Sequence, residues 1–276
     1  MRLQILGTAA AEGWPAVFCG CTNCQRAREL GGKNIRTRSG AVLGTTHKID
    51  FSPDSFSQAL RHSLDWEKLE HIFVTHSHGD HFYPAEIAMR QEVFAHPPVG
   101  QERMRELRIY GDQYVYERLV EAVPNYEAAN VTFHQLEAFT PVRAGSIMAV
   151  PLPADHMLDK NAFIYLFSEK GKTLLYALDT GWFPGETWDF LDSGLTLDCV
   201  VLDATCGSLS CSSGHMGIGE VIRTKEELTK RGLLAEKAVV IANHFSHNGG
   251  LLHHELEERL APHGIITAYD GMTVAF

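Results

Sequence analysis

The side chains best suited to chemistry stand in residues 76–81, which read His-Ser-His-Gly-Asp-His. In an extended or tightly turned loop, residues two apart project to the same side, so His76 and His78 can bind one ion together. Asp80 and His81 then point away from that pair and can reach a second ion. Neutral imidazole and carboxylate groups suit zinc, iron or manganese. A solvated polar loop is the alternative, but the strand-like run before the motif favours a site for two cations.

A second group of metal-binding side chains lies near the N-terminus, where Cys19, Cys21 and Cys24 fall within six residues. Three thiolates leave a tetrahedral structural zinc site one ligand short, and the fourth should be a His or Cys from elsewhere in the fold. In a reducing cytoplasm, zinc is a better interpretation of these cysteines than disulfides, with a redox role and chance as alternatives. Six cysteines in 276 residues do not suggest a disulfide framework.

Strand-like runs rich in β-branched and aromatic residues must position these side chains. The clearest runs are 3–6, 41–43, 72–75, 108–110, 147–151, 163–167, 173–178, 199–203, 239–242 and 265–269. Four runs end in or beside a candidate ligand: His76, His156, Asp179 and His244. Because short loops after strands fix side chains at one edge of a sheet, we expect these ligands to converge there.

Helical spacing of apolar residues alternates with the strands and predicts helices over 52–64, 113–123, 217–231 and 250–261. Ser52, Pro53 and Asp54 would open the first of these helices as its cap, first-turn proline and early acid. Gly232 and Gly264 are well placed to end the last two. The alternation indicates an α/β fold with many strands.

Composition indicates a soluble globular chain with a sizeable core, because 45% of its residues are hydrophobic and 21% are charged. The formal net charge is −10, with no block of basic residues. A protein that grips nucleic acid through phosphates should carry a basic stripe, so nucleic acid is disfavoured as a partner. No run approaches the roughly 18 apolar residues of a membrane span, and the first apolar run stops at Gly7. We therefore expect a cytoplasmic protein.

The motif at 76–81 resembles the hallmark of the metallo-β-lactamase superfamily, in which His-x-His-x-Asp-His follows a strand. The later ligands of that family appear here in order. The resemblance implies one ligand set for each cation and one bridging carboxylate: His76, His78 and His156; Asp80, His81 and His244; and Asp179. It also implies an αββα sandwich, two mixed β-sheets flanked by helices, formed by residues 1–276 as one domain.

Other interpretations remain open at three of these positions. Asp179 precedes a Thr-Gly pair and could cap a turn, although the apolar run before it would bury its carboxylate beside a cation. His247 competes with His244 for the active site. The family also has an acid that orients ligands without binding metal. Asp50 matches it, but the residues after Asp50 depart from the family pattern, and Asp54 is the alternative.

The cysteine cluster is similar to the N-terminal pattern of the phosphoribosyl cyclic phosphodiesterases of the PhnP family. In that subfamily a His three residues beyond the last active-site His completes a structural zinc site. The likeness implies that His247 joins the three cysteines and that His244 belongs to the active site. Residues 201–205 and 214–216 also resemble the segment that carries a catalytic, non-ligand His in this subfamily and in the transfer-RNA 3′-processing endonucleases. The likeness implies that His215 protonates the leaving oxygen and that Asp203 orients it. A solvated loop His is the alternative for His215.

These likenesses lead to the hypothesis of a binuclear hydrolase that cleaves a small, cyclic phosphodiester such as a phosphoribosyl cyclic phosphate. It would hold two divalent ions, zinc or manganese, in an active site that includes Asp80, and one structural zinc. The alternatives are a transfer-RNA 3′-processing-type endonuclease, a lactone or thioester hydrolase, and a catalytically silent accessory protein. We expect a small-molecule substrate as the partner and no association with a membrane. The sequence is compatible with a homodimer. Arg36 and Arg38 could touch a substrate phosphate, although basic side chains in loops are usually solvated.

Overall fold

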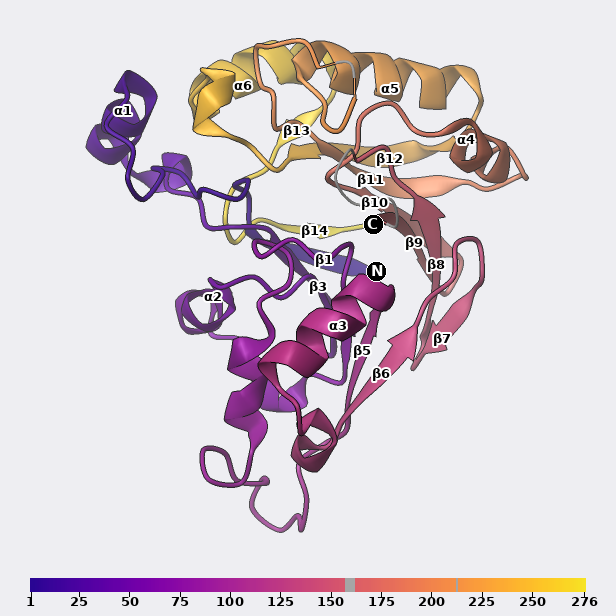
Figure 1. The fold of residues 1–276 in the computed structure, drawn as a ribbon. Helices are drawn as coiled ribbons and strands as arrows, with labels where there is room; N and C mark the ends of the chain where they lie inside the picture. The colour runs from indigo at the N-terminus through magenta and orange to yellow at the C-terminus, as the bar shows by residue number, and fades with distance from the viewer. Residues whose placement is uncertain (157–161, 212) are drawn as a thin grey trace.

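The computed structural model describes residues 1–156, 162–211 and 213–276, which form two seven-stranded sheets that pack face to face (Figure 1). The first sheet has the order β14 (Thr273–Ala275), β1 (Arg2–Gly7), β2 (Gly40–Leu43), β3 (His47–Ile49), β4 (His71–Phe73), β5 (Leu107–Gly111) and β6 (Val131–Gln135). The second has the order β13 (Ile266–Thr267), β12 (Leu234–Asn243), β11 (Leu197–Asp203), β10 (Lys172–Ala177), β9 (Phe163–Glu169), β8 (Ile147–Pro153) and β7 (Val142–Ala144).

The helices of the described residues are α1 (Thr22–Leu30), α2 (Ser55–His62), α3 (Gln113–Ala122), α4 (Gly185–Leu191), α5 (Ile218–Lys230) and α6 (His253–Leu260). Helices cover the outer face of each sheet, whereas α1 projects away from the sandwich (Figure 1). In Figure 1, α5 and α6 lie over β12 and β13, whereas α3 lies against β5 and β6 of the other sheet. The αββα sandwich of two mixed sheets that the resemblance implied is therefore confirmed.

The strand directions bring the candidate ligands to one edge of the sandwich. β3, β4 and β5 are parallel neighbours in the first sheet, as are β10, β11 and β12 in the second. β8 runs in the same direction as β10, because both are antiparallel to β9 between them. Since these strands end at the same edge, the loops that follow them can meet there.

The end of β4 is fixed by hydrogen bonds between the two sheets. The Tyr165 hydroxyl of β9 donates to the Val74 carbonyl at 2.6 Å, and the Phe163 N–H donates to the Thr75 carbonyl at 2.9 Å. The Tyr165 ring also packs edge-on against Phe73 with ring centroids 5.7 Å apart. Tyr165 is buried, so its hydroxyl needs the Val74 carbonyl as an acceptor. These contacts hold the backbone directly before His76.

The ten expected strands all overlap observed ones, but β3, β6, β7, β14, α1 and α4 were not expected. The missed strands are short, and three of them lie at sheet edges, where one-sided burial leaves a weak alternating pattern. Helix α1 is polar and buries only Cys24 and Ala27, so it carries little amphipathic signal.

The expected opening of α2 was wrong, because the helix begins at Ser55 rather than near Pro53. Asp54 stands at the cap position without capping the helix. Its carboxylate instead accepts from the Arg38 N–H at 2.9 Å and lies 3.2 Å from the Arg38 guanidinium.

We predict that Tyr165→Phe lowers the free energy of unfolding by about 1–3 kcal/mol, because it removes a buried hydrogen bond to the Val74 carbonyl. Equilibrium urea unfolding of the metal-loaded protein measures the change. Tyr114→Phe is the matched control, since the Tyr114 side chain is 49% exposed. The control should stay within about 0.5 kcal/mol of the parent. Equal stability of the two variants would show that the bond between the sheets contributes nothing.

Candidate metal centre

The motif at 76–81 forms a tight turn directly after β4. The N–H groups of His81 and Phe82 both donate to the His78 carbonyl, at 3.1 Å and 2.8 Å. His76 and His81 are buried, whereas His78 and Asp80 are half-buried at the rim. The turn directs all four candidate ligands of the motif toward the junction of the two sheets.

The first candidate cation site is formed by His76, His78 and His156. His76 Nε2 lies 2.8 Å from His78 Nδ1, and His156 Nε2 lies 3.2 Å from the same atom. The three ligand atoms lie within 4.8 Å of one another. His156 follows β8 of the second sheet and the other two follow β4 of the first, so the site spans both sheets.

The second candidate site is formed by Asp80, His81 and His244. His81 Nε2 lies 3.1 Å from His244 Nε2 and 3.3 Å from Asp80 Oδ2. Asp179 lies beside this set, with Oδ2 2.6 Å from His81 Nε2 and 3.3 Å from His244 Nε2. It also groups with His76 of the first set, so its carboxylate lies where a ligand shared by two cations must lie.

Hydrogen bonds on the far side of two imidazoles fix which ring nitrogen faces the centre. His156 Nδ1 lies 3.1 Å from the Gly214 carbonyl, and a carbonyl can only accept. His81 Nδ1 lies 2.7 Å from the buried carboxylate of Asp50. Both rings therefore donate through Nδ1, and each Nε2 is the nitrogen directed toward the other ligands.

Two threonines do the same for His76 and His244. Thr75 Oγ1 donates to Asp50 at 2.9 Å and accepts from His76 Nδ1 at 3.0 Å. Thr205 Oγ1 lies 2.8 Å from His244 Nδ1, and its own proton goes to Asp203 or to the His244 carbonyl. The tautomer of each of these imidazoles is thus set by a hydroxyl that has already given its proton elsewhere.

Nε2 lone pairs that face one another and a carboxylate at about 3 Å repel unless a cation lies between them. Asp179 Oδ2 is buried and accepts no hydrogen bond from the described residues, although two imidazoles surround it. Burial raises the pKa of Asp179, but the nearby His244 and His81 lower it well below its usual range. Burial lowers the pKa of His76, so its ring is neutral. Burial also lowers the pKa of His81, but the charges of Asp179, Asp50 and Asp80 raise it well above its usual value, so without a metal this ring carries the positive charge of the site. Neutral imidazoles and an ionised carboxylate are the states in which these groups bind divalent metals.

The acid that orients the ligands is Asp50, not Asp54. Asp50 is buried and accepts from His81 Nδ1 and from the Thr75 N–H at 2.8 Å. Asp54 binds Arg38 instead. Arg38 also donates to the Ala11 carbonyl.

Arg36 was named in the sequence as a candidate contact for a substrate phosphate, and the structure corrects this. Its guanidinium is buried and donates to Thr8 Oγ1 and to the Ala268 carbonyl, each at 2.7 Å. It also lies 4.4 Å from the centre of the Phe245 ring. Arg36 therefore joins the segments that follow β1, β12 and β13.

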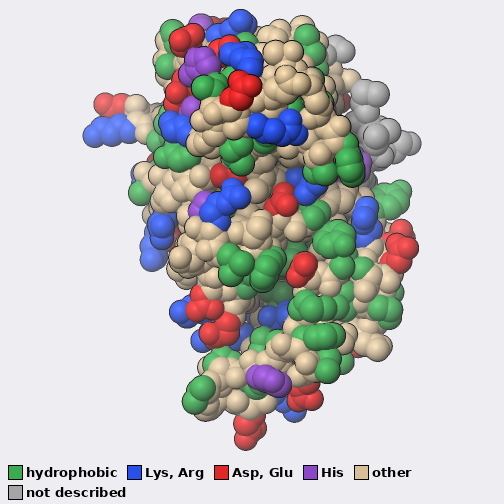
Figure 2. All heavy atoms as spheres, turned by 90° about the vertical axis from the view of Figure 1, so that its left-hand side faces the viewer, with side chains coloured by type: hydrophobic (Ala, Val, Ile, Leu, Met, Phe, Trp, Pro, Cys, Tyr) green, Lys and Arg blue, Asp and Glu red, His purple; other side chains and the backbone are tan. Residues whose placement is uncertain are grey.

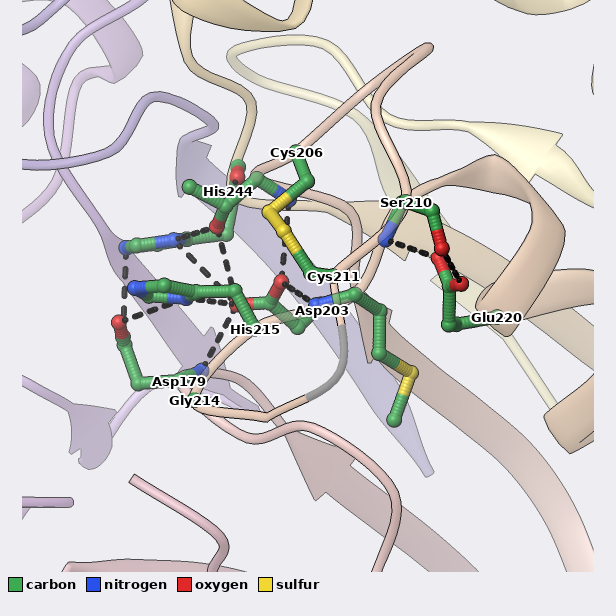
Figure 3. Close-up of a disulfide and its surroundings, with 12 residues drawn as sticks. Asp179, Asp203, Cys206, Ser210, Cys211, Gly214, His215, Glu220 and His244 are labelled. Atoms are coloured by element: carbon green, nitrogen blue, oxygen red, sulfur yellow. Dashed lines mark hydrogen bonds and ion pairs between the residues drawn. A yellow bond between two sulfur atoms is a disulfide. The ribbon is translucent and has the colours of Figure 1, made fainter. Parts of the chain in front are cut away.

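His215 lies beside the second site (Figure 3). It groups with Asp179, Asp203 and His244, whose ligand atoms all lie within 4.8 Å of one another, so a role outside the ligand set stays a prediction. Its Nδ1 is 3.1 Å from Asp203 Oδ2 and 3.6 Å from Asp179 Oδ1. The ring stacks at 6.0 Å on His244, and its side chain is 30% exposed. Burial lowers the pKa of His215, but the hydrogen bond and charge of Asp203 raise it to about 9. This imidazole can reach both the ligand cluster and solvent.

Cys19, Cys21, Cys24 and His247 form a separate cluster, in which all four ligand atoms lie within 4.8 Å of one another. His247 Nδ1 is 3.5 Å from the Cys21 sulfur and 3.8 Å from the Cys19 sulfur. The structure thus separates the two competing histidines, His244 to the active-site cluster and His247 to the cysteines. Four such ligands suit a tetrahedral zinc ion.

Three groups that orient ligands, and one disulfide, were not predicted from the sequence. Thr75 and Thr205 adjoin candidate ligands or their orienting acid, a position that could have drawn attention to them, whereas the Gly214 carbonyl gives no sequence signal. The disulfide between Cys206 and Cys211 was also unexpected (Figure 3). No disulfide framework was expected from the sequence. The bond found is local, because it joins two residues five apart.

Comparison with known proteins identifies the family. Residues 48–241 match the family model described as the beta-lactamase superfamily domain. The chain belongs to the metallo-β-lactamase superfamily. Its buried His and Asp cluster is typical of the binuclear metal site of that superfamily. No curated protein matches the sequence. No helix within the described ranges has the length and apolar character needed to cross a membrane.

Solved structures share this fold over the whole chain. A diphosphatase from the PhnP family is 24% identical, with a TM-score of 0.76 over 100% of this chain and 97% of that one. Zn²⁺-bound PqqB from Methylobacterium extorquens is 14% identical, with a TM-score of 0.77 over 100% of both chains. The short form of human tRNase Z is 17% identical, with a TM-score of 0.68 over 100% of this chain and 99% of that one.

We predict that Asp50→Asn weakens metal binding at the active site by about 10–100-fold. The two carboxylate oxygens of Asp50 accept from Thr75 and His81, whereas the amide of Asn has one neutral acceptor oxygen. Competition with a chromophoric chelator measures the affinity. Asp54→Asn is the control and should bind metal like the parent, since Asp54 contacts Arg38. A larger loss in the Asp54 variant would reverse the assignment of the two acids.

We also predict that Cys21→Ser lowers the zinc content of the purified protein by about one ion per chain and reduces its thermal stability. Cys199→Ser removes a thiol that is buried in the core and belongs to none of the candidate metal clusters of the described residues, so it should leave the zinc content unchanged. Elemental analysis of both variants gives the comparison. An unchanged zinc content in the Cys21 variant would contradict the structural site.

Proposed function

We propose that this protein hydrolyses a small phosphodiester, with a cyclic phosphate on a ribose as the preferred class of substrate. The observation that carries the proposal is the His215–Asp203 pair beside the ligand cluster. A phosphodiester has a poor leaving group, because the departing alkoxide must gain a proton as the bond to phosphorus breaks. The position of His215 between the cluster and solvent suits it to supply that proton.

The roles of the remaining residues follow from their hydrogen bonds. Asp203 fixes the orientation of His215 by accepting from Nδ1, which leaves Nε2 to hold the proton that is transferred. Asp50, Thr75 and Thr205 hold the ligands in their binding tautomers, so no ring has to turn during the reaction. Two divalent cations bound by these ligands would polarise a phosphoryl oxygen and lower the pKa of an attacking water. We propose zinc or manganese there and zinc at the cysteine cluster.

The cysteine cluster supports the assignment to the phosphodiesterase branch. The sequence pattern of Cys19, Cys21, Cys24 and His247 resembles that of the PhnP family, and these four side chains meet in the structure. The likeness to a structure named a diphosphatase of the PhnP family points to phosphate chemistry as well. An ester, thioester or lactone needs less help at the leaving group, so those substrates would make less use of His215.

A transfer-RNA endonuclease is the second candidate, favoured by the likeness to human tRNase Z. The net charge of −10 opposes it. On the face drawn in Figure 2, basic and acidic side chains are interspersed, without a continuous basic stripe. Because phosphate contacts dominate the affinity for nucleic acid, a filter-binding assay with transfer RNA at low salt separates the two candidates.

We predict that His215→Ala retains the metals of the parent but lowers kcat by about 10²–10⁴-fold on a cyclic ribose phosphate. The loss should shrink on bis(p-nitrophenyl) phosphate, because p-nitrophenolate leaves without a proton. Steady-state kinetics and elemental analysis test both parts. His254→Ala, at an exposed position on α6, is the control and should match the parent.

Two outcomes would contradict the proposed function. An equal loss on both substrates would remove the proton-donor role from His215. Rapid hydrolysis of a lactone or thioester, with no turnover of any phosphodiester, would exclude the phosphodiesterase.

A further inference from the structure

The segment that links β11 to α5 orients much of the metal centre. Thr205 sets the tautomer of His244, and the Gly214 carbonyl sets that of His156. His215 lies between these two ligands, with ring centroids 5.1 Å from His156 and 6.0 Å from His244. A shift of this segment would therefore disturb His215, the proposed proton donor to the leaving group, and the orientation of one ligand at each cation site.

The Cys206–Cys211 disulfide closes a small loop within this segment, next to the ligand cluster (Figure 3). Cys206 directly follows Thr205. The Cys206 N–H donates to the Met216 carbonyl at 2.9 Å, and the Met216 N–H donates to Asp203 Oδ1 at 2.9 Å. The disulfide is thus connected by two hydrogen bonds to the residue that follows His215 and to the acid that orients it.

A reductant in solution can reach this bond. Both cysteines are half-buried, and residues 208–210 between them are exposed, with Leu209 56% exposed. The other cysteines differ, because Cys199 is buried in the core and the remaining three belong to the candidate zinc cluster. Cys206 and Cys211 are more exposed than Cys199 and belong to no candidate metal cluster of the described residues. Thiol–disulfide exchange is therefore directed to this pair.

Two hydrogen bonds would still anchor the loop at Ser208 and Ser210 after the disulfide opens. The Ser208 N–H donates to the Gly249 carbonyl at 2.9 Å, and the Ser210 hydroxyl donates to Glu220 Oε1 at 2.8 Å. Opening the bond therefore adds conformational freedom near His215 without removing these contacts. The ligands themselves come from other segments of the chain, and Thr75 and Asp50, which fix His76 and His81, lie outside this loop, so one oriented ligand remains at each cation site.

We propose that Cys206 and Cys211 form a reversible dithiol–disulfide modification site, and that reduction by a dithiol lowers the catalytic rate by loosening the position of His215. One thiolate of the dithiol attacks a sulfur of the pair, which breaks the S–S bond and forms a mixed disulfide. The second thiolate then displaces the protein sulfur and leaves as the cyclic disulfide. Two electrons pass to the protein, and two protons complete the thiols of Cys206 and Cys211.

The test uses the full-length, metal-loaded protein before and after reduction by a phosphine, which does not strip zinc as dithiols can. Alkylation and mass spectrometry count the thiols at positions 206 and 211. Hydrogen exchange follows the Met216 N–H, elemental analysis follows the metals, and bis(p-nitrophenyl) phosphate and a cyclic ribose phosphate report the rate. Only the rate measurements rest on the proposed phosphodiesterase function.

We expect two new alkylated thiols, faster exchange at the Met216 N–H, unchanged metal content and a roughly tenfold lower kcat on the cyclic phosphate. Reoxidation should restore the rate. The double variant Cys206→Ser with Cys211→Ser should show the low rate with or without reductant. If both substrates are inert but the thiols and the exchange change as expected, the proposed function fails and the redox site stands.

Two results would overturn the redox site itself. One is a disulfide that resists reduction in the folded protein. The other is a reduced protein with unchanged exchange at Met216 and an unchanged rate.

Discussion

The metal centre depends on positive charge at the edge of the sandwich, because ring nitrogens and a buried carboxylate face one another there and would otherwise repel. His76, His81, His156 and His244 each give the Nδ1 proton to an acceptor outside the cluster, so each directs Nε2 to the centre. The buried Asp179 carboxylate lies among them. Positive charge makes this arrangement favourable, and two divalent cations, one at each ligand set, would supply it.

The outer hydrogen-bond acceptors explain why the fold needs two sheets to build one site. Asp50 and Thr75 belong to the first sheet and set the rings of His76 and His81. Asp203 and Thr205 follow β11 of the second sheet and set His244. The hydrogen bond from Tyr165 to the Val74 carbonyl joins the two sheets next to this point. The position of each ligand therefore depends on the packing between the sheets as well as on its own loop.

The ligands could be predicted from the sequence because they are local or follow buried strands, two patterns that residue types record directly. The choice between His244 and His247, or between Asp50 and Asp54, could not be derived from the residues alone. Each choice depends on where loops distant in sequence meet in space. The Gly214 carbonyl acts through its backbone and leaves no trace in the sequence. The edge strands β7 and β14 were missed because few of their residues are buried.

Anomalous diffraction from crystals of the zinc-loaded protein tests most directly whether this cluster binds two neighbouring cations. We expect two strong peaks about 3.5–4 Å apart, with Asp179 between them. A third peak should lie among Cys19, Cys21, Cys24 and His247. A single peak at the active site, or no peak there after soaking in zinc or manganese, would contradict the binuclear centre.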